Sequence, residues 1–173
     1  VLGVYFKLQT FIYMPANGIV QGMRPIIGYN YGAGESSRVK STIRYSLLTA
    51  AGLMLTGTIL ALALPKQILA LFDADAALMS AGVTALRIIS LGFLVSSVGL
   101  IYSGVFEAIG NGRNSLIISL LRQFVITIPL SFILTRFFGP TGVWISFPVG
   151  ELCASAAAFC LLKKYQNGAF SPL

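Results

Sequence analysis

The chain has 173 residues, of which 56% are hydrophobic and only 10% are charged. Soluble domains usually carry about 25% charged residues, so this composition excludes an ordinary soluble globular protein and indicates a chain immersed in lipid. The formal charge of +7 comes from 12 Lys and Arg scattered between apolar runs, which excludes a basic nucleic-acid surface and points to membrane topology.

Residue types that support catalysis or metal binding are scarce. The sequence has no histidine, and its two cysteines, Cys153 and Cys160, lie in one apolar run. On a helix these two positions are about 10 Å apart, which is beyond the reach of a disulfide. We therefore expect no metal site, no cofactor and no enzymatic activity, and the first partner that we predict is membrane lipid.

The apolar runs predict an all-α, polytopic transmembrane helix bundle, because one span needs about 20 mainly apolar residues. The first span is the least apolar, and the last two should form a hairpin around residues 139–142. We expect residues 1–165 to form one transmembrane unit followed by a tail at 166–173. The five expected spans are 1–22, 41–64, 82–109, 115–138 and 143–163.

The connection after the second span differs from the other loops. Residues 66–80 are short and amphipathic, and we expect them to lie along the membrane interface as a broken helix. Asp73 or Asp75 should cap the turn before the third span. The chain begins with Val and shows no cleavable signal, so we interpret it as part of a longer protein.

The distribution of positive residues predicts an orientation, since cytoplasmic loops are enriched in Lys and Arg. If the spans alternate, seven positive residues fall on one side and only Lys66 and Arg136 fall on the other. We therefore expect the C-terminus to be cytoplasmic. The seven residues are Arg24, Arg38, Lys40, Arg44, Arg113, Lys163 and Lys164.

Glu151 is the only acid deep inside a predicted span. A charged carboxylate there costs several kcal/mol unless it is protonated, paired or bound to a cation. In one interpretation a proton and a lipophilic cation compete for Glu151, which is the minimum requirement for exchange. In the other, Glu151 forms a structural ion pair with Arg122, about 8 Å away in height by helix arithmetic.

Several other residues are candidates of lower priority. Glu107 near the end of the third span is interpreted first as solvated or paired with Arg113. Lys7 can reach the membrane surface only if its helix starts near Val1, and otherwise it becomes a further site candidate. The aromatic candidates for contacting a flat cation are Tyr5, Tyr13, Tyr102 and Phe147. The candidate kinks or hinges are Pro15, Pro129 and Pro148.

The stretch from Gln21 to Lys40 reads QGMRPIIGYNYGAGESSRVK and has unusual chemistry for a membrane loop. We interpret it as a cytoplasmic elbow in which Pro25 ends the first span and basic residues meet lipid headgroups. It is a weak phosphate cradle, because no Gly-Lys-Ser or Gly-Lys-Thr triplet is present. The residues that define this signature loop are Gln21, Gly22, Pro25, Gly28, Asn30, Gly32 and Arg38.

This signature resembles the cytoplasmic stretch after the eighth helix of the multidrug and toxic compound extrusion (MATE) transporters. The stretch 107–115, together with residues 121–123, is similar to the region that joins the family's tenth and eleventh helices. Residues 142–148 are similar to the opening of the twelfth. The resemblance covers the last five of twelve helices, so the chain would be most of one lobe of a two-lobed transporter.

The resemblance implies a bacterial inner-membrane antiporter that exports small cationic amphiphiles in exchange for H⁺ or Na⁺ by alternating access. Its missing amino-terminal lobe would then be a partner. Some members bind the coupling ion through an acid in the tenth helix, where this chain has Ser96 and Ser97. The alternatives are a lipid-linked precursor flippase of related architecture, which would favour a cationic cavity, and a structural membrane subunit that does not transport.

Overall fold

The computed structural model describes the backbone of residues 2–72 and 76–169, and their side chains except those of residues 2, 4–8, 76–78 and 166–169. Throughout this part of the chain the only regular structure is helical, which confirms the all-α fold. The elements are α1 (Leu2–Gly32), α2 (Ser36–Ala63), α3 (Pro65–Ala70), α4 (Ala76–Ala108), α5 (Gly112–Leu120), the π-helical turn η1 (Leu121–Val125), α6 (Thr127–Phe138) and α7 (Pro140–Ala169).

Four segments of the described chain combine the length and apolarity of a membrane span. They are Ser36–Ala63, Met79–Ala108, Gly112–Phe138 and Pro140–Tyr165. The third consists of α5, η1 and α6 joined end to end. The predicted first span corresponds to α1, which at 31 residues and about 46 Å is long enough to cross a bilayer but is not among the four. Polar residues such as Asn17 and Arg24 inside α1 account for this.

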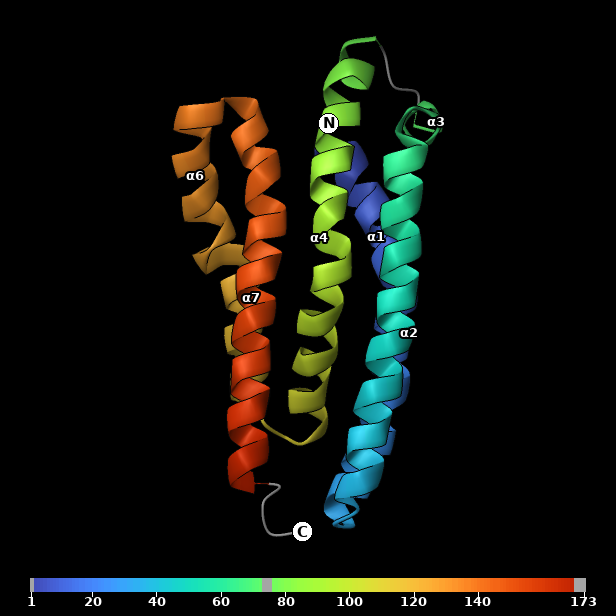
Figure 1. The fold of residues 1–173 in the computed structure, drawn as a ribbon, viewed down its shortest axis with the longest axis vertical. Coiled ribbons are helices and arrows are strands. Elements are labelled where there is room, and N and C mark those ends of the chain that lie inside the picture. Colours follow the sequence, from blue (N-terminus) through green and yellow to red (C-terminus); the bar gives the residue numbers. More distant parts are fainter. Residues whose placement is uncertain (1, 73–75, 170–173) are drawn as a thin grey trace.

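The helices run alternately up and down, as the sequence predicted (Figure 1). The turn between α1 and α2, the turn between α4 and α5, and the last residues of α7 lie at one end of the bundle. The short helix α3 and the turn between α6 and α7 lie at the other end. In this arrangement α4 is central, with α1 and α2 on one side and α7, flanked by α6, on the other.

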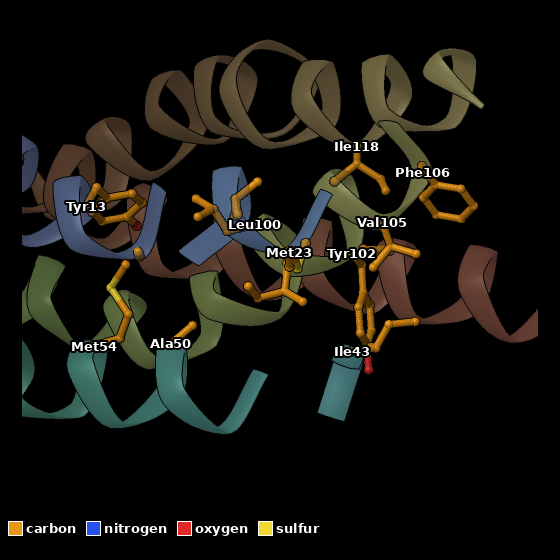
Figure 2. Close-up of a cluster of buried hydrophobic side chains, with 14 of the residues drawn as sticks. Tyr13, Met23, Ile43, Ala50, Met54, Leu100, Tyr102, Val105, Phe106 and Ile118 are labelled. Atoms are coloured by element: carbon orange, nitrogen blue, oxygen red, sulfur yellow. The ribbon is translucent and has the colours of Figure 1, made fainter. Parts of the chain in front are cut away.

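The core is built around α4. Figure 2 shows Tyr13 and Met23 of α1, three α2 side chains, and Leu100, Tyr102, Val105 and Phe106 of α4 gathered in one cluster. Large apolar side chains also cover the outside, where Phe132 is 74% exposed and Phe137 is 77% exposed. An apolar exterior of this kind suits lipid, and it agrees with the membrane assignment.

Hydroxyl groups connect the helices inside the bundle. Thr58 Oγ1 of α2 donates a hydrogen bond of 3.1 Å to the carbonyl of Ser90 in α4. Ser155 Oγ of α7 donates one of 2.8 Å to the carbonyl of Val95 in α4. Small polar residues are common at helix contacts in membranes because they let backbones approach and can hydrogen-bond across the interface.

The prediction that the signature residues form a loop is wrong. Gln21, Gly22, Pro25, Gly28, Asn30 and Gly32 all belong to α1, and Arg38 lies in the first turn of α2. The turn is confined to residues 33–35, where Gly34 has a φ of 76°. Pro25 does not end the helix, and a Cβ at position 28 would lie 3.2 Å from the carbonyl oxygen of Ala108. Gly28 therefore serves close packing of α1 on α4, and Asn30 satisfies the carbonyl of Ile26 at 2.8 Å.

The three proline candidates divide into two kinds. Pro15 and Pro148 lie inside α1 and α7, as predicted. Pro129 is in the first turn of α6, directly after η1, so the interruption of this span is a π-helical turn and not a proline kink alone. Of the predicted interfacial segment at 66–80, the first part lies in α3 and the last five residues already belong to α4, while Asp73 and Asp75 lie outside the described residues. The helix of α7 continues to Ala169, beyond the predicted start of the tail, and residues 170–173 also lie outside the described residues.

Phe93 provides a test of the core. Its ring is 1% exposed and meets the ring of Tyr13 edge-on, with centroids 6.0 Å apart. Phe93→Ala should lower the free energy of unfolding by about 2 kcal/mol. In lipid, exposing the lost apolar surface costs little, but the empty cavity that the ring leaves still costs ~24 cal/mol per Å³. Phe132→Ala on the outer face is the matched control and should change stability little. Thermal unfolding in detergent measures both, and equal losses would contradict the placement of Phe93 in the core.

Candidate functional site

The deep acid predicted from the sequence meets a cation and a phenol at the centre of the bundle. Glu151 of α7 lies with its Oε1 3.8 Å from Nε of Arg122 in η1. Tyr13 of α1 donates a hydrogen bond of 3.5 Å to the same oxygen. The side chains of Glu151 and Arg122 are 14% and 20% exposed, so both charges are largely buried. Three helical segments that are distant in the sequence thus converge on one carboxylate.

The π-helical turn positions Arg122. Ile126 N–H bonds to the carbonyl of Leu121 at 3.2 Å, five residues earlier, and the hydroxyl of Thr127 bonds to the carbonyl of Arg122 at 2.6 Å. Such turns insert one residue into a helix and are frequent at functional sites. Pro129 has no N–H to offer, so the helix cannot form an ordinary ladder through this point. The turn satisfies the freed Arg122 carbonyl and places the side chain of Arg122 beside α7.

A glycine lets α7 come close enough for the pair to form. Gly150 is buried, and a Cβ at this position would overlap the hydroxyl of Thr127. The residue next to Glu151 must therefore be small if α7 is to pack directly on the junction of η1 and α6. This contact brings Glu151 and Arg122 within 3.8 Å and closes the gap of about 8 Å in height expected from helix arithmetic.

A polar cavity of about 270 Å³ borders the pair. Phe147, one turn before Glu151 on α7, supplies an aromatic wall. Neither Nε of Arg122 nor Oε2 of Glu151 has a hydrogen-bond partner among the described protein groups. Both atoms are buried, and their hydrogen-bonding capacity is not met by the described protein groups around the cavity. The lining residues are Gln9, Arg122, Gln123, Thr127, Phe147 and Glu151.

This arrangement has the chemistry of a carboxylate that can change partners. At 3.8 Å the Arg122–Glu151 contact is an ion pair without a hydrogen bond between the two atoms. The carboxylate has one oxygen occupied by Tyr13 and the other free of protein donors. A proton or a cation can reach the second oxygen while the first stays fixed.

The structure gathers four of the predicted site residues and separates another. Glu151, Arg122, Tyr13 and Phe147 come together. Tyr102 packs in the core on α4, with its ring 6.4 Å from that of Phe159, and does not line the cavity. Tyr5 and Lys7 lie outside the residues whose side chains the structure describes. None of the seven signature-loop residues lines this cavity.

Glu107 has a different partner from the one expected. It forms an ion pair with Arg24 of α1, not with Arg113, and its Oε1 accepts a hydrogen bond of 2.8 Å from Ser115. The expectation failed because Arg24 was assigned to a loop, whereas the continuation of α1 past Pro25 keeps this side chain against α4.

Sequence reasoning missed Gln9, Thr127 and Gly150. Thr127 had no clear local signal, because its hydroxyl satisfies the Arg122 carbonyl that the π-helical turn, and not Pro129, leaves without a backbone donor. Gly150 had no local signal, because its role depends on which helix packs against it. Among the described residues no group of three or more His, Cys, Asp or Glu side chains could hold a metal ion.

The fold and the site define a polytopic α-helical membrane protein with a paired carboxylate buried between its helices, which is the arrangement of a transporter. A sequence model of the MatE family matches residues 1–133. The chain belongs to the MatE family, and the family resemblance read from the sequence is confirmed.

Curated relatives agree with this assignment. The chain is 30% identical over 156 residues to the multidrug export protein MepA of Staphylococcus aureus (strain bovine RF122 / ET3-1), covering 90% of this chain and 34% of MepA. It is 28% identical over the same length to MepA of Staphylococcus saprophyticus, with the same coverage. The chain therefore spans about a third of the length of these relatives. Their names give no support to the flippase alternative, and they agree with a protein that is not an enzyme.

Solved structures give the same fold. The MATE multidrug transporter DinF-BH, solved as a complex with a ligand, superposes with a TM-score of 0.87 at 33% identity over 96% of this chain and 37% of that one. An outward-facing MATE family transporter of the MOP superfamily superposes with a TM-score of 0.91 at 21% identity, covering 99% of this chain and 39% of that one.

Gly150 offers a test of how the site is built. Gly150→Ala should lower the free energy of unfolding by about 1–3 kcal/mol, the usual cost of overpacking, because its methyl group meets Thr127. The double variant with Thr127→Ala should recover part of that loss. Gly52→Ala is the control, since no atom lies within 4 Å of the Cβ position there, and it should be neutral or slightly stabilising. Thermal unfolding in detergent measures the stability of all three variants. If Gly52→Ala is also destabilised, the loss in Gly150→Ala cannot be assigned to contact with Thr127.

Proposed function

We propose that this chain forms most of one lobe of a secondary multidrug antiporter, which exports cationic amphiphiles in exchange for protons by alternating access. Glu151 is the exchange site in this proposal. When its carboxyl group holds a proton it offers no charge to a cation, and when the proton leaves it attracts one. Binding of the two ions is then mutually exclusive, which is the requirement for exchange at a shared site.

The observation that carries the proposal is the position of Glu151. It is about 17 Å along α7 from Pro140 and about 21 Å from Tyr165, so it lies near the middle of the span. Ionisable residues at such depth are costly and usually serve transport. The carboxylate also faces a polar cavity with one oxygen free of protein donors, which a purely structural pair would not require.

Protons are favoured over sodium by the ligands present. A sodium site needs several oxygen ligands, yet neither Ser96 nor Ser97 in the middle of α4 lines the cavity beside Glu151. Tyr13 approaches Glu151 as a donor, which suits a carboxylate but not a cation. A proton requires only the carboxylate itself.

The remaining partners belong to the same proposal. The chain would pack against an amino-terminal lobe of the same protein. Phe147, which lines the cavity, would offer its ring to the organic cation. We also propose that the protein resides in a bacterial inner membrane with its C-terminus in the cytoplasm, because most positive residues lie at the end of the bundle that holds the last turn of α7.

The proposal can be tested by efflux of ethidium from cells that express the longest reading frame containing this chain. Glu151→Gln should lower the rate of efflux by about tenfold or more and abolish its dependence on pH, because the exchangeable carboxyl group is gone. A tenfold loss corresponds to about 1.4 kcal/mol of interaction free energy. The ligand of the DinF-BH complex is a second probe. Unchanged efflux and an unchanged pH profile would remove Glu151 from the mechanism.

Arg122 separates an exchange role from a structural one. Removing one member of a buried ion pair destabilises a protein by about 3–5 kcal/mol, so Glu151→Gln alone can fail for structural reasons. The double variant with Arg122→Gln removes both charges and should fold. If Glu151 is the exchange site, the double variant still lacks pH-dependent efflux. If efflux and its pH profile return, the pair is only structural.

The orientation is tested separately by cysteine labelling with an impermeant thiol reagent, in a background where Cys153 and Cys160 are replaced by Ser. Arg113→Cys lies in the first turn of α5 and should be labelled only from the cytoplasmic side. Arg136→Cys, near the turn between α6 and α7, should be labelled only from outside. Both positions are exposed, so reagent access is not limited by packing. The reverse pattern would contradict the proposed topology.

A further inference from the structure

A second polar cavity lies between α1, α4 and the segment formed by α5 and η1. Its volume is about 160 Å³, well above the ~10–15 Å³ that one water molecule needs. It is therefore large enough to hold several water molecules. Its polar lining residues are Asn17, Arg24, Ser103, Glu107, Ser119 and Arg122.

The outer part of this cavity is organised by an ion pair. Arg24 and Glu107 are joined across α1 and α4, each with about a third of its side chain exposed. Glu107 also accepts a hydrogen bond from Ser115, whose hydroxyl lies 2.7 Å from that of Ser103. These groups lie toward the end of the bundle that holds the turns between α1 and α2 and between α4 and α5.

The inner end of the cavity is Arg122, which also lines the cavity beside Glu151. The guanidinium group therefore stands between two polar cavities. Nε of Arg24 and Nε of Arg122 are buried without a hydrogen-bond partner among the described protein groups. Buried donors of this kind are normally satisfied by water, and both of these border a cavity large enough to hold it.

We propose that the cavity between α1, α4 and α5 is a hydrated route by which protons reach Glu151 from the end of the bundle where Arg24 and Glu107 lie. This inference rests on the proposed function, since it supplies the proton that Glu151 exchanges. The Arg24–Glu107 pair forms the mouth of the route, and Arg122 forms its inner limit.

Charge balance explains how two arginines can border a path for protons. An unpaired arginine repels cations in a narrow pore, but here each guanidinium has a carboxylate partner. Once Glu151 has taken up a proton, the charge of Arg122 is no longer balanced and opposes a second cation. The route therefore admits one proton at a time. The described charged and titratable groups along it are Tyr13, Arg24, Glu107, Arg122 and Glu151.

Silver-ion labelling of introduced cysteines tests this route, because Ag⁺ is small and reacts with the thiolate that forms only in water. In the longest reading frame containing this chain, with Cys153 and Cys160 replaced by Ser, Ser119→Cys should react at least tenfold faster than Ile117→Cys. Ile117 lies two residues away, on the opposite face of α5, and does not line the cavity. Arg38→Cys, exposed at the start of α2, shows that the reagent is active.

Three further variants keep the test independent of folding and of transport. Ser103→Cys probes the same cavity from α4 if Ser119→Cys does not fold. Glu107→Gln should increase the reaction rate at Ser119→Cys severalfold, because it opens the mouth. In the Glu151→Gln background the labelling should persist even if efflux is lost or was never coupled to Glu151. Equal rates at Ser119→Cys and Ile117→Cys, or no change with Glu107→Gln, would overturn the route while leaving the proposed function intact.

Discussion

The structure depends on holding two opposite charges in the middle of a bundle whose outer surface is apolar. An unpaired charge at this depth is costly, because the surrounding hydrocarbon does not solvate it. The pair is held at 3.8 Å by features that have no other evident purpose in the fold. The π-helical turn shifts the register of the span from α5 to α6, Gly150 brings α7 close, and Tyr13 fixes one carboxylate oxygen.

The same constraint shapes the helices around the pair. The central helix α4 keeps small hydroxyl residues where it passes the site, and Ser96 and Ser97 satisfy themselves within the helix. They add no charge that would compete with Arg122 for Glu151. The outer face carries Phe132, Phe137 and many other exposed apolar side chains, as lipid contact requires. Polar chemistry is thus concentrated between α1, α4, α7 and the broken span, where the two cavities lie.

Sequence alone predicted what depends on composition and periodicity. The all-α fold, the end of α6 at Phe138 and the burial of Glu151 inside its span are all consequences of runs of apolar residues and one acid that interrupts them. The continuation of α1 through Pro25 could not be predicted, because a proline ends a helix in water but is tolerated where packing satisfies the freed carbonyl. The Arg24–Glu107 pair was missed for the same reason. The π-helical turn and the contact between Gly150 and Thr127 depend on tertiary packing, which local sequence does not encode.

The presence of Arg122 beside the exchange site bears on which cations the proposed antiporter would accept. A cation that replaces Arg122 as the partner of Glu151 must leave water, and the cost of doing so is largest for a small ion with concentrated charge. An organic cation spreads its charge over a large apolar body, so it loses less hydration and gains contact with the ring of Phe147. A proton avoids the cost altogether, because it neutralises the carboxylate. In the proposed mechanism the Arg122–Glu151 pair would therefore act as a threshold that protons and lipophilic cations pass and small hydrated metal ions do not, which is the selectivity that proton-driven export of amphiphiles would require.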